Sequence, residues 1–352
     1  MPWTTDNIAS QQGKIIVVTG GNSGIGFEAA NVLAQKGAEV VLACRDAQRG
    51  EKACREIREA HPAAEVSAML LDLADLASVR AFAAAFQERF PRLDVLIDNA
   101  GVMVPPRGET ADGFESQMGV NHLGHFALTG LLLPALRNAP APRVVVTTSV
   151  MHRAGCLCSL DFKRQGRCHR PWRSYSDSKL ANLSFALELH RRLGGGEQGV
   201  TAIAVHPGVT ATGLQRHLRL SRALTSLIAM KPWQGVLPTL YAATSPELSG
   251  GEFFGPDGCL GVRGYPAPAK PSRRARDAAL GRRLWEASEE ATGVRYGAYW
   301  RAGTARPAKD AGLAAQRGRK VRRACRAACR PCRRQRGSRP RWPRRRGRPR
   351  PC

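Results

Sequence analysis

Tyr175 and Lys179 form the most suggestive pair of chemical groups in the sequence, in the stretch YSDSK just before the apolar run LANLSFALEL. On a helix, residues four apart share a face, so both side chains could point into one site. A free phenol, with a pKa of about 10, is a poor base at neutral pH. A neighbouring ammonium favours the phenolate, so Tyr175 could take up and release a proton. Such pairs also occur on ordinary helix surfaces, and the rest of the chain must distinguish the two interpretations.

A glycine-rich turn follows the first apolar run of the chain, KIIVV. The turn, TGGNSGIG at 19–26, has the pattern TGxxxGxG and precedes a segment with helical periodicity. Glycine lets the backbone turn tightly and approach a pyrophosphate, whose charge the helix N-terminus favours. Between a strand and a helix, the pattern predicts a dinucleotide-binding turn rather than a turn built for packing alone. The residues expected to contact the dinucleotide here are Gly20, Asn22, Ser23, Gly24, Ile25 and Gly26.

The second apolar run indicates which nicotinamide cofactor would bind. It ends EVVLACRD at 39–46, where a carboxylate commonly holds the ribose hydroxyls of NAD. Here the position holds Cys44, and Arg45 follows it. A guanidinium suits a 2′-phosphate, and a thiol does not replace the missing carboxylate. We therefore expect NADP(H), with NAD as the alternative and with Arg45 as a cofactor contact, unless Arg45 is only a solvated loop residue.

The elements that would position these groups alternate along the chain. Short runs rich in β-branched residues are separated by segments of helical periodicity from residue 14 to about residue 205. The runs are KIIVVTG, EVVLAC, VSAMLLDL, LDVLIDNAG, PRVVVTTS and VTAIAVHPG. Apolar strands alternating with helices predict a parallel sheet with helices on both faces, a doubly wound α/β fold of the Rossmann type. GGEFFG at 250–255 would add a strand, and we expect one domain over residues 1–296.

Residues 297–352 differ from the rest of the chain in composition. They hold 20 Lys and Arg and one acid, whereas the net charge of residues 1–296 is only +7. A segment so poor in aliphatic residues cannot bury enough apolar surface to fold, so we expect a disordered C-terminal tail. It could bind nucleic acid or another polyanion through counterion release, although we do not expect this to be the main role. The alternatives are a tail without a selected role and a misread end of the gene.

Location and metal binding follow from what the sequence lacks. No run approaches the roughly 20 apolar residues of a membrane helix, and no signal peptide is evident, so we expect a cytoplasmic protein. The ten cysteines lack a paired framework, which predicts free thiols. The irregular spacing of Cys156, Cys158, Cys168 and His169 does not favour a zinc site. CRAACRPC at 325–332 lies in the arginine-rich tail and does not predict an iron–sulfur cluster, so no metal is expected.

Taken together, the motifs resemble those of the short-chain dehydrogenase/reductase family over about residues 13–296. The individual motifs match those of the family, and they also occur in the same order along the chain. DNAG at 98–101 stands where the family usually has NNAG, so Asp98 is a departure. The resemblance implies four catalytic residues: Asn121 in MGVNHLGHF, Ser149 in RVVVTTS, and Tyr175 and Lys179 of YxxxK. It also implies that the cofactor contacts include Asp72, Leu73, Asn99, Ala100, Gly101, Tyr175, Lys179, Pro207, Gly208 and Thr212.

The family's chemistry assigns a role to each catalytic residue. Tyr175 would act as the general acid or base while hydride moves between substrate and cofactor, and Lys179 would also hold the nicotinamide ribose. Ser149 would hydrogen-bond the substrate oxygen, and Asn121 would hold a water that resupplies the proton. The resemblance further implies a homo-oligomer.

Three features place the chain near one branch of the family. The 26-residue separation of Ser149 from Tyr175, the stretch ACRD and the stretch SKLANLSFALEL resemble retinol dehydrogenase-like and protochlorophyllide reductase-like members, here without an N-terminal membrane anchor. That branch implies NADP(H) and a lipophilic substrate, over which the apolar segment 213–235 could form a lid rather than an ordinary packed helix. We expect interconversion of a carbonyl and an alcohol. The alternatives are reduction of a C=C bond and a non-catalytic dinucleotide-binding protein with a polyanion-binding tail.

Overall fold

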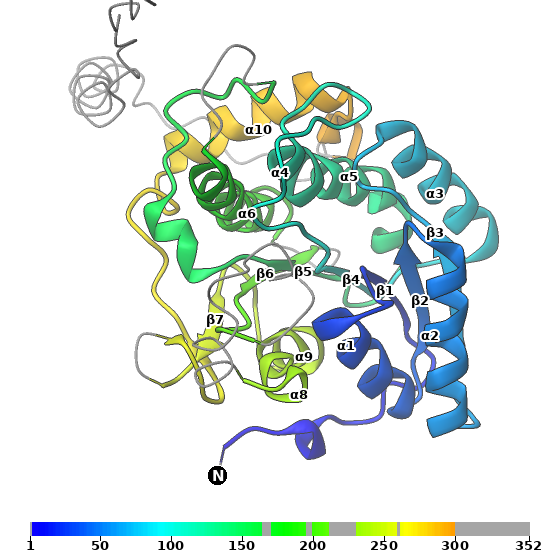
Figure 1. Ribbon diagram of the computed structural model, residues 1–352. Helices are drawn as coiled ribbons and strands as arrows, with labels where there is room; N and C mark the ends of the chain where they lie inside the picture. The colour runs from blue at the N-terminus through cyan, green and yellow to red at the C-terminus, as the bar shows by residue number, and fades with distance from the viewer. Residues whose placement is uncertain (1, 164–169, 195–198, 211–229, 259–260, 300–352) are drawn as a thin grey trace, which may run out of the picture. The chain divides into compact units, whose positions relative to one another are not determined.

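The β-branched runs form the strands of one eight-stranded sheet in a computed structural model that describes residues 2–163, 170–194, 199–210, 230–258 and 261–299 (Figure 1). The strand order is β3-β2-β1-β4-β5-β6-β7-β8, and every neighbouring pair up to β7 is parallel. The strands are β1 (Ile15–Thr19), β2 (Glu39–Cys44), β3 (Val66–Leu70), β4 (Val95–Asp98), β5 (Arg143–Thr147), β6 (Thr201–Val205), β7 (Phe253–Pro256) and β8 (Pro266–Pro268).

Helices cover both faces of the sheet, which confirms the predicted doubly wound α/β fold (Figure 1). On one face lie α1 (Gly24–Gln35), α2 (Ala47–Ala60) and α9 (Leu237–Thr244), with the short α8 (Pro232–Gly235) against α1. On the other lie α3 (Leu76–Arg89), α5 (Gly124–Arg137), α6 (Pro171–Leu193) and α10 (Ala278–Thr292). The short elements are α4 (Ser116–Met118), a π-helix (Gly119–Leu123) and the 3₁₀ helices Thr5–Asn7, Val150–Ala154 and Tyr296–Tyr299.

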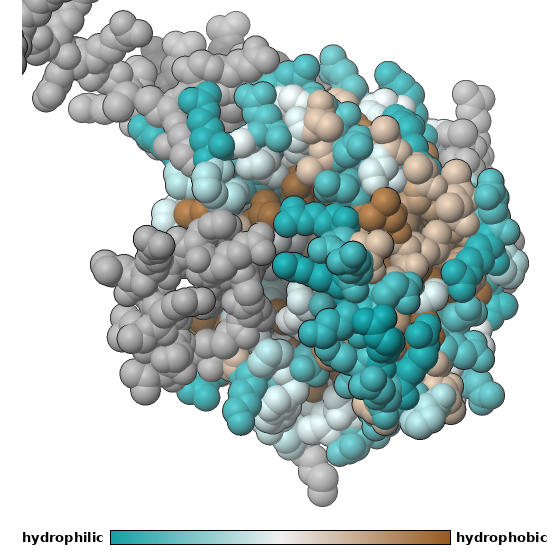
Figure 2. Space-filling model, turned by 45° about the vertical axis from the view of Figure 1, so that its right-hand side comes forward, coloured by the Kyte–Doolittle hydropathy of each residue, from teal (hydrophilic) through white to brown (hydrophobic). Residues whose placement is uncertain are grey.

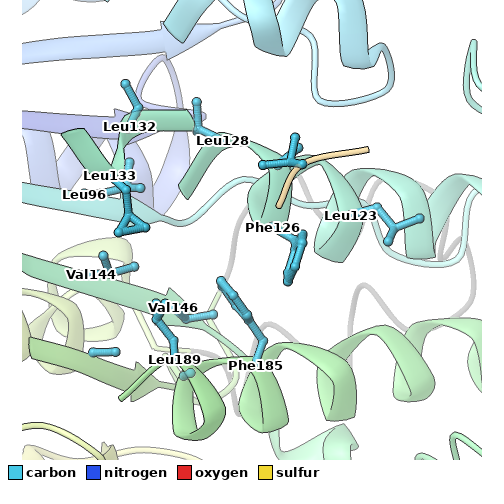
Figure 3. Close-up of a cluster of buried hydrophobic side chains, with 14 of the residues drawn as sticks. Leu96, Leu123, Phe126, Leu128, Leu132, Leu133, Val144, Val146, Phe185 and Leu189 are labelled. Carbon is cyan, nitrogen blue, oxygen red and sulfur yellow. The ribbon is translucent and has the colours of Figure 1, made fainter. Parts of the chain in front are cut away.

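Alternation along β1 explains why both faces are covered. Val17 belongs to the core cluster on the α5 and α6 side, whereas Ile16 and Val18 belong to the cluster on the α1 and α9 side. Successive strand residues point to opposite faces, so an uninterrupted apolar run buries both. On the α5 and α6 side, the rings of Phe126 and Phe185 point toward one another, with centroids 5.4 Å apart (Figure 3).

The last strand was not predicted, and its sequence explains why. The strand β7 begins in GGEFFG, as expected, and extends to Pro256, but it pairs with an antiparallel strand, β8. This strand has only three residues, and Pro266 and Pro268 are two of them. Proline cannot donate to a sheet ladder and is tolerated at an edge, so a proline-rich stretch gives no recognisable strand pattern.

The cysteine prediction was wrong at one place. Cys156 and Cys158 form a disulfide just after the 3₁₀ helix Val150–Ala154, where the chain turns so that their Cα atoms lie 5.6 Å apart. That separation is within the usual range for a disulfide. Cys44 and Cys54 are free thiols and buried.

Several predictions fall outside the described residues. They include residues 300–352 of the tail, the residues Cys168 and His169, and most of the segment 213–235, of which only 230–235 are described. Met230 there pairs with Thr210 in an isolated bridge. None of the described helices combines the length and the apolar composition needed to cross a bilayer.

Candidate active site

The predicted site residues gather where the strand order reverses. From β1 the chain proceeds outward to β2 and β3 and then returns to β4 on the other side of β1 (Figure 1). Ligands of doubly wound sheets bind at the carboxyl ends of the strands beside such a reversal. The glycine turn follows β1, Arg45 follows β2, and Asn99 follows β4. The fold therefore brings residues from distant motifs to one edge of the sheet.

The glycine turn is shaped for close backbone approach. Gly20 has φ +66° and its N–H donates to Ala43 O at 2.8 Å, while Gly24 has φ +58° where α1 begins. A Cβ on Gly26 would collide with the Gly20 carbonyl oxygen and, at 2.5 Å, with the Asn99 side-chain nitrogen. Glycine is thus required here because of both conformation and space.

The first turn of α1 presents donors that suit a phosphate. Ser23 is the N-cap residue and is exposed, but its side chain forms no capping hydrogen bond. The first backbone N–H groups of a helix have no partner within the helix, and the helix dipole favours an anion there. Asn22 and Ile25 are half-buried beside it. The turn and the uncapped helix end together fit the pyrophosphate of a dinucleotide.

Arg45 is free to meet a ligand at the end of β2. Its side chain is exposed, and none of the residues that the structure describes forms an ion pair or hydrogen bond with it. By contrast, Arg49 pairs with Asp46 at 3.4 Å. Hydrophilic side chains cover much of the face that Figure 2 turns forward, where α2 buries only a narrow stripe. Cys44 is buried, and burial raises the pKa of its thiol, so it offers no anion to replace a carboxylate.

The segment after β3 is held by its own polar groups. The Asp72 carboxylate accepts from Ala74 N at 2.9 Å, and Asp72 N donates to Ser78 Oγ at 3.0 Å. Leu73 is buried against Gly124 at the start of α5. Both predicted contacts therefore lie in an ordered turn, and their roles toward an adenine stay predictions.

Thr19, at the end of β1, joins the glycine turn to the segment after β4. Its hydroxyl accepts from Asn99 N and Ala100 N, each at 2.9 Å, and Asn99 Nδ2 donates to Thr19 O at 2.9 Å. We did not predict this role from the sequence. The threonine of TGxxxGxG was the available signal, but its partners lie about 80 residues away.

Asn121 lies in the π-helix Gly119–Leu123, and its side chain forms three hydrogen bonds. Its Oδ1 accepts from Val102 N at 2.7 Å, and its Nδ2 donates to Val102 O and to Ser178 Oγ, each at 3.0 Å. π-helical turns inside helices occur frequently at functional sites. The contacts attach the segment after Gly101 to α6, and the predicted role of Asn121 in holding a water stays a prediction.

The phenol of Tyr175 meets the hydroxyl of Ser149. The Ser149 hydroxyl lies close enough to the phenol to lower its pKa by hydrogen bonding, and it accepts from Met151 N at 3.3 Å. Tyr175 lies on the first turns of α6, which begins with Pro171, and Ser149 ends the segment after β5. Two of the predicted catalytic side chains are thus in contact, although 26 residues separate them in the sequence.

Lys179 lies one helical turn further along α6, as predicted. Its ammonium lies 5.7 Å from the centroid of the Tyr175 ring and donates to Thr147 O at 3.3 Å. A Cβ placed on Gly101 would lie 3.7 Å from that nitrogen and 3.1 Å from Asn121 Oδ1. The Lys179 ammonium therefore lies near both the Tyr175 ring and Gly101, in the segment that follows β4.

Burial shifts both titrating groups toward their neutral forms. It raises the pKa of Tyr175 to about 12, against an opposing effect of the Ser149 hydrogen bond, and lowers the pKa of Lys179 to about 8. We expected the neighbouring ammonium to lower the pKa of Tyr175, and here the removal of water outweighs it. Tyr175 is therefore a protonated donor at neutral pH in this structure.

The segment after β6 leaves the sheet at the same edge as the segment after β5. Gly208 has φ +67°, and its N–H donates to His206 Nδ1 at 3.2 Å, while Pro207 O accepts from Thr210 Oγ1 at 2.9 Å. A Cβ on Gly208 would meet Val262 O and Met230. Thr212 lies outside the described residues.

Asp98, the departure from NNAG, is buried directly beside Asn99. One carboxyl oxygen accepts from Thr129 Oγ1 at 3.1 Å, and Oδ1 has no hydrogen-bond partner among the residues that the structure describes. Burial raises the pKa of this carboxyl well above its ordinary value. Because the unfolded chain releases this proton near pH 4 and the folded chain retains it, rising pH favours unfolding.

Asp98→Asn should therefore stabilise the protein at pH 8 by about 1 to 3 kcal/mol, because an amide does not have to take up a proton when the chain folds. Thermal unfolding of both proteins from pH 4 to pH 8 measures the effect. The difference in Tm should shrink as the pH falls to 4, where the unfolded Asp98 carboxyl begins to retain its proton. A constant difference across this range, or a less stable variant at pH 8, would contradict the assignment of a buried, protonated carboxyl.

Comparison with known proteins identifies the class to which this fold and site belong. The sequence pattern described as short chain dehydrogenase matches residues 14–223. The chain belongs to this family, the short-chain dehydrogenases/reductases, whose members use NAD(P), and it is an oxidoreductase. Two similar solved structures contain NADP, RhlG of Pseudomonas aeruginosa and a short chain dehydrogenase of Shigella flexneri, at 25% and 26% identity and TM-scores of 0.54 and 0.55. They cover 67% and 69% of this chain and 91% and 96% of their own.

Within the family the chain is retinol dehydrogenase-like. It is 43% identical to human retinol dehydrogenase 12 over 81% of this chain and 88% of the relative, and 41% identical to human retinol dehydrogenase 13 over 81% and 86%. An uncharacterised protein from Mycobacterium paratuberculosis is 41% identical, with a TM-score of 0.70 over 84% of this chain and 99% of its own.

Proposed function

We propose that the protein is an NADP(H)-dependent oxidoreductase that interconverts a carbonyl and an alcohol on a lipophilic substrate. The observation that carries this proposal is the buried phenol of Tyr175, which contacts the Ser149 hydroxyl and lies beside the Lys179 ammonium. A protonated phenol paired with a hydroxyl suits a carbonyl oxygen that must gain a proton. Their place at the carboxyl ends of the strands, with the glycine turn, suits a dinucleotide.

In the direction of reduction, the bound cofactor supplies a hydride to the carbonyl carbon. Tyr175 donates its proton to the carbonyl oxygen, so one hydride and one proton convert the C=O bond to an alcohol. The Ser149 hydroxyl donates a hydrogen bond to the same oxygen while negative charge develops on it. The Lys179 ammonium stabilises the phenolate left behind, and it holds the ribose hydroxyls. Oxidation of an alcohol reverses each transfer, with the phenolate as the base.

Arg45 supports NADP(H) over NAD(H), because it is an exposed guanidinium without a protein partner at the end of β2. Arg45→Ala should raise the Kd for NADPH by about 10- to 100-fold, the effect of losing a hydrogen-bonded charge pair, and leave the Kd for NADH unchanged. Fluorescence titration with each cofactor measures both values. Arg49→Ala is the matched control, since Arg49 already pairs with Asp46. An equal rise in the Kd for both cofactors in Arg45→Ala, or a rise in the Kd for NADPH in Arg49→Ala, would contradict the assignment.

A lipophilic substrate is supported by the apolar residues around the site. Val102, Met103 and Val104 follow Gly101 directly and are half-exposed rather than buried in the core. Asn121 holds the first of them at the site through two hydrogen bonds. The relatives named retinol dehydrogenases favour a long-chain or polyene alcohol and its aldehyde as the first substrates to assay. Reduction of a C=C bond stays the alternative outcome of that assay, and the cytoplasmic location, the homo-oligomer and polyanion binding by the tail stay predictions.

A further inference from the structure

His125 uses both ring nitrogens to join the two halves of the site. It lies in the first turn of α5 and is 2% exposed. Its Nδ1 lies 3.0 Å from Asn121 O, and its Nε2 lies 2.9 Å from Thr19 Oγ1. The proposed hydride and proton transfers do not use this ring.

The surrounding groups fix which nitrogen carries the proton. A carbonyl oxygen can only accept, so His125 Nδ1 must donate to Asn121 O. The Thr19 hydroxyl already accepts from Asn99 N and Ala100 N, which occupies both of its lone pairs. The Thr19 hydroxyl has one proton and two acceptors within reach, His125 Nε2 at 2.9 Å and Ile97 O at 3.2 Å. The shorter contact assigns the proton to Nε2, so the ring is neutral with its own proton on Nδ1. Burial, with a smaller effect of the Lys179 charge, lowers the pKa of His125 to about 4, which agrees with a neutral ring.

The Nε2 contact supports the cofactor side of the site. Thr19 holds the backbone of Asn99, whose side-chain nitrogen occupies the space where a Cβ of Gly26 would be. With its proton directed to His125, the Thr19 hydroxyl keeps both lone pairs for Asn99 N and Ala100 N. The bond to Nε2 thereby ties Thr19, together with its contacts to the segment after β4, to the first turn of α5.

The Nδ1 contact supports the proton-transfer side. It holds the backbone of Asn121, whose side chain donates to Ser178 Oγ. Ser178 Oγ in turn donates to Tyr175 O at 2.8 Å, and Ser178 directly precedes Lys179 on α6. A displacement of Asn121 would thus reach the turn of α6 that carries both Tyr175 and Lys179.

We propose that His125 is a positioning residue that couples the cofactor-binding turn, through Thr19, to the turn of α6 that carries Tyr175 and Lys179, through Asn121. The proposal rests on the proposed function for its catalytic half and on contacts within this chain for its binding half. The two bonds are made by different ring nitrogens, Nδ1 and Nε2, so a substitution can remove one bond and keep the other.

Two substitutions separate the two bonds. In His125→Asn, the side-chain amide nitrogen occupies the place of Nδ1 and can still donate to Asn121 O, but nothing reaches Thr19. In His125→Gln, the longer side chain places an oxygen near the position of Nε2 and keeps the Thr19 bond. We expect His125→Asn to raise the Kd for NADPH by about tenfold and to change kcat by less than about twofold. We expect His125→Gln to lower kcat by about tenfold and to keep the wild-type Kd.

The experiment measures the Kd by fluorescence titration with NADPH and kcat with a responsive aldehyde, on the full chain. His122 is the matched control: it is 1% exposed and lies one turn earlier, but its Nε2 pairs with Ser288 in α10. His122→Asn and His122→Gln should lower Tm without separating Kd from kcat. Thr19→Val, which removes the hydroxyl, should raise the Kd as His125→Asn does, and Thr19→Ser should restore it, so the binding half stays testable if a histidine variant fails to fold.

Equal changes of Kd and kcat in both His125 variants, or the same pattern in the His122 variants, would overturn the proposal. A wild-type protein that bound NADPH but reduced no carbonyl would overturn the proposed function instead. The titrations would then still decide the binding half of the coupling, which requires a higher Kd in His125→Asn than in His125→Gln.

Discussion

Replacing Tyr175 with phenylalanine should lower kcat/KM for reduction of a lipophilic aldehyde by about 10²- to 10⁴-fold, the usual contribution of a positioned general acid. The substitution removes the phenolic proton and the hydrogen bond to Ser149, and it leaves the ring beside Lys179 in place. Because the glycine turn and Arg45 are untouched, the Kd for NADPH should remain close to that of the wild type. Steady-state kinetics with NADPH, together with fluorescence titration of the cofactor, measures the two quantities separately.

Tyr241→Phe provides a matched control for the loss of a hydroxyl. Tyr241 is half-buried on α9, and its hydroxyl donates to Glu247 at 3.0 Å, away from the predicted catalytic residues. This variant should retain the wild-type kcat/KM. If Tyr175→Phe also retained it, Tyr175 could not be the proton donor, and its ring would be an ordinary buried side chain of α6.

Replacing Gly26 with valine should abolish measurable binding of NADPH, with a rise in Kd of at least about 100-fold, the effect of roughly 3 kcal/mol. A side chain at this position collides with the Gly20 carbonyl oxygen and the Asn99 side chain. The backbone of the glycine turn must therefore move away from the start of α1 to accommodate valine. The displaced turn no longer presents its N–H groups and the start of α1 to a pyrophosphate. Equilibrium dialysis or fluorescence titration with NADPH measures the loss.

Gly108→Ala is the control for replacing a glycine as such. The nearest atom that its Cβ would meet is Pro106 O at 3.9 Å, and its φ is not in the left-handed region. NADPH affinity and Tm should both stay at the wild-type values. Gly26→Val with an unchanged Kd would show that the cofactor does not lie over this turn.

The arrangement of the strands could be predicted from local patterns. Each β-branched run between residues 14 and 205 became a parallel strand, because an uninterrupted apolar run can only be satisfied between two layers of helices. The spacing of Tyr175 and Lys179 likewise fixed their common position on α6, since four residues complete one helical turn. Features that depend on residues close together in the sequence, such as the strands and the spacing of Tyr175 and Lys179, could therefore be predicted.

The properties of the site that depend on packing were not predictable. The pKa of Tyr175 is raised because segments distant in the sequence bury the phenol. Counting the charged residues near Tyr175 in the sequence does not reveal this burial. The link from Thr19 to His125 spans 106 residues, and neither residue type alone signals it. The carboxyl of Asp98 differs from the family's asparagine by a single group, yet its protonation depends on an enclosure that the sequence does not show.

Hydride transfer to a carbonyl carbon is measured most directly with NADPH that carries deuterium at the transferable position of the nicotinamide. The wild-type protein and all-trans-retinal should yield retinol with one deuterium on the alcohol carbon, detected by mass spectrometry and NMR, and Tyr175→Phe should yield almost none. Deuterium on a carbon of a former C=C bond would identify the alternative reductase chemistry. Full binding of NADPH without deuterium in any product from a panel of lipophilic aldehydes and ketones would contradict a carbonyl reductase.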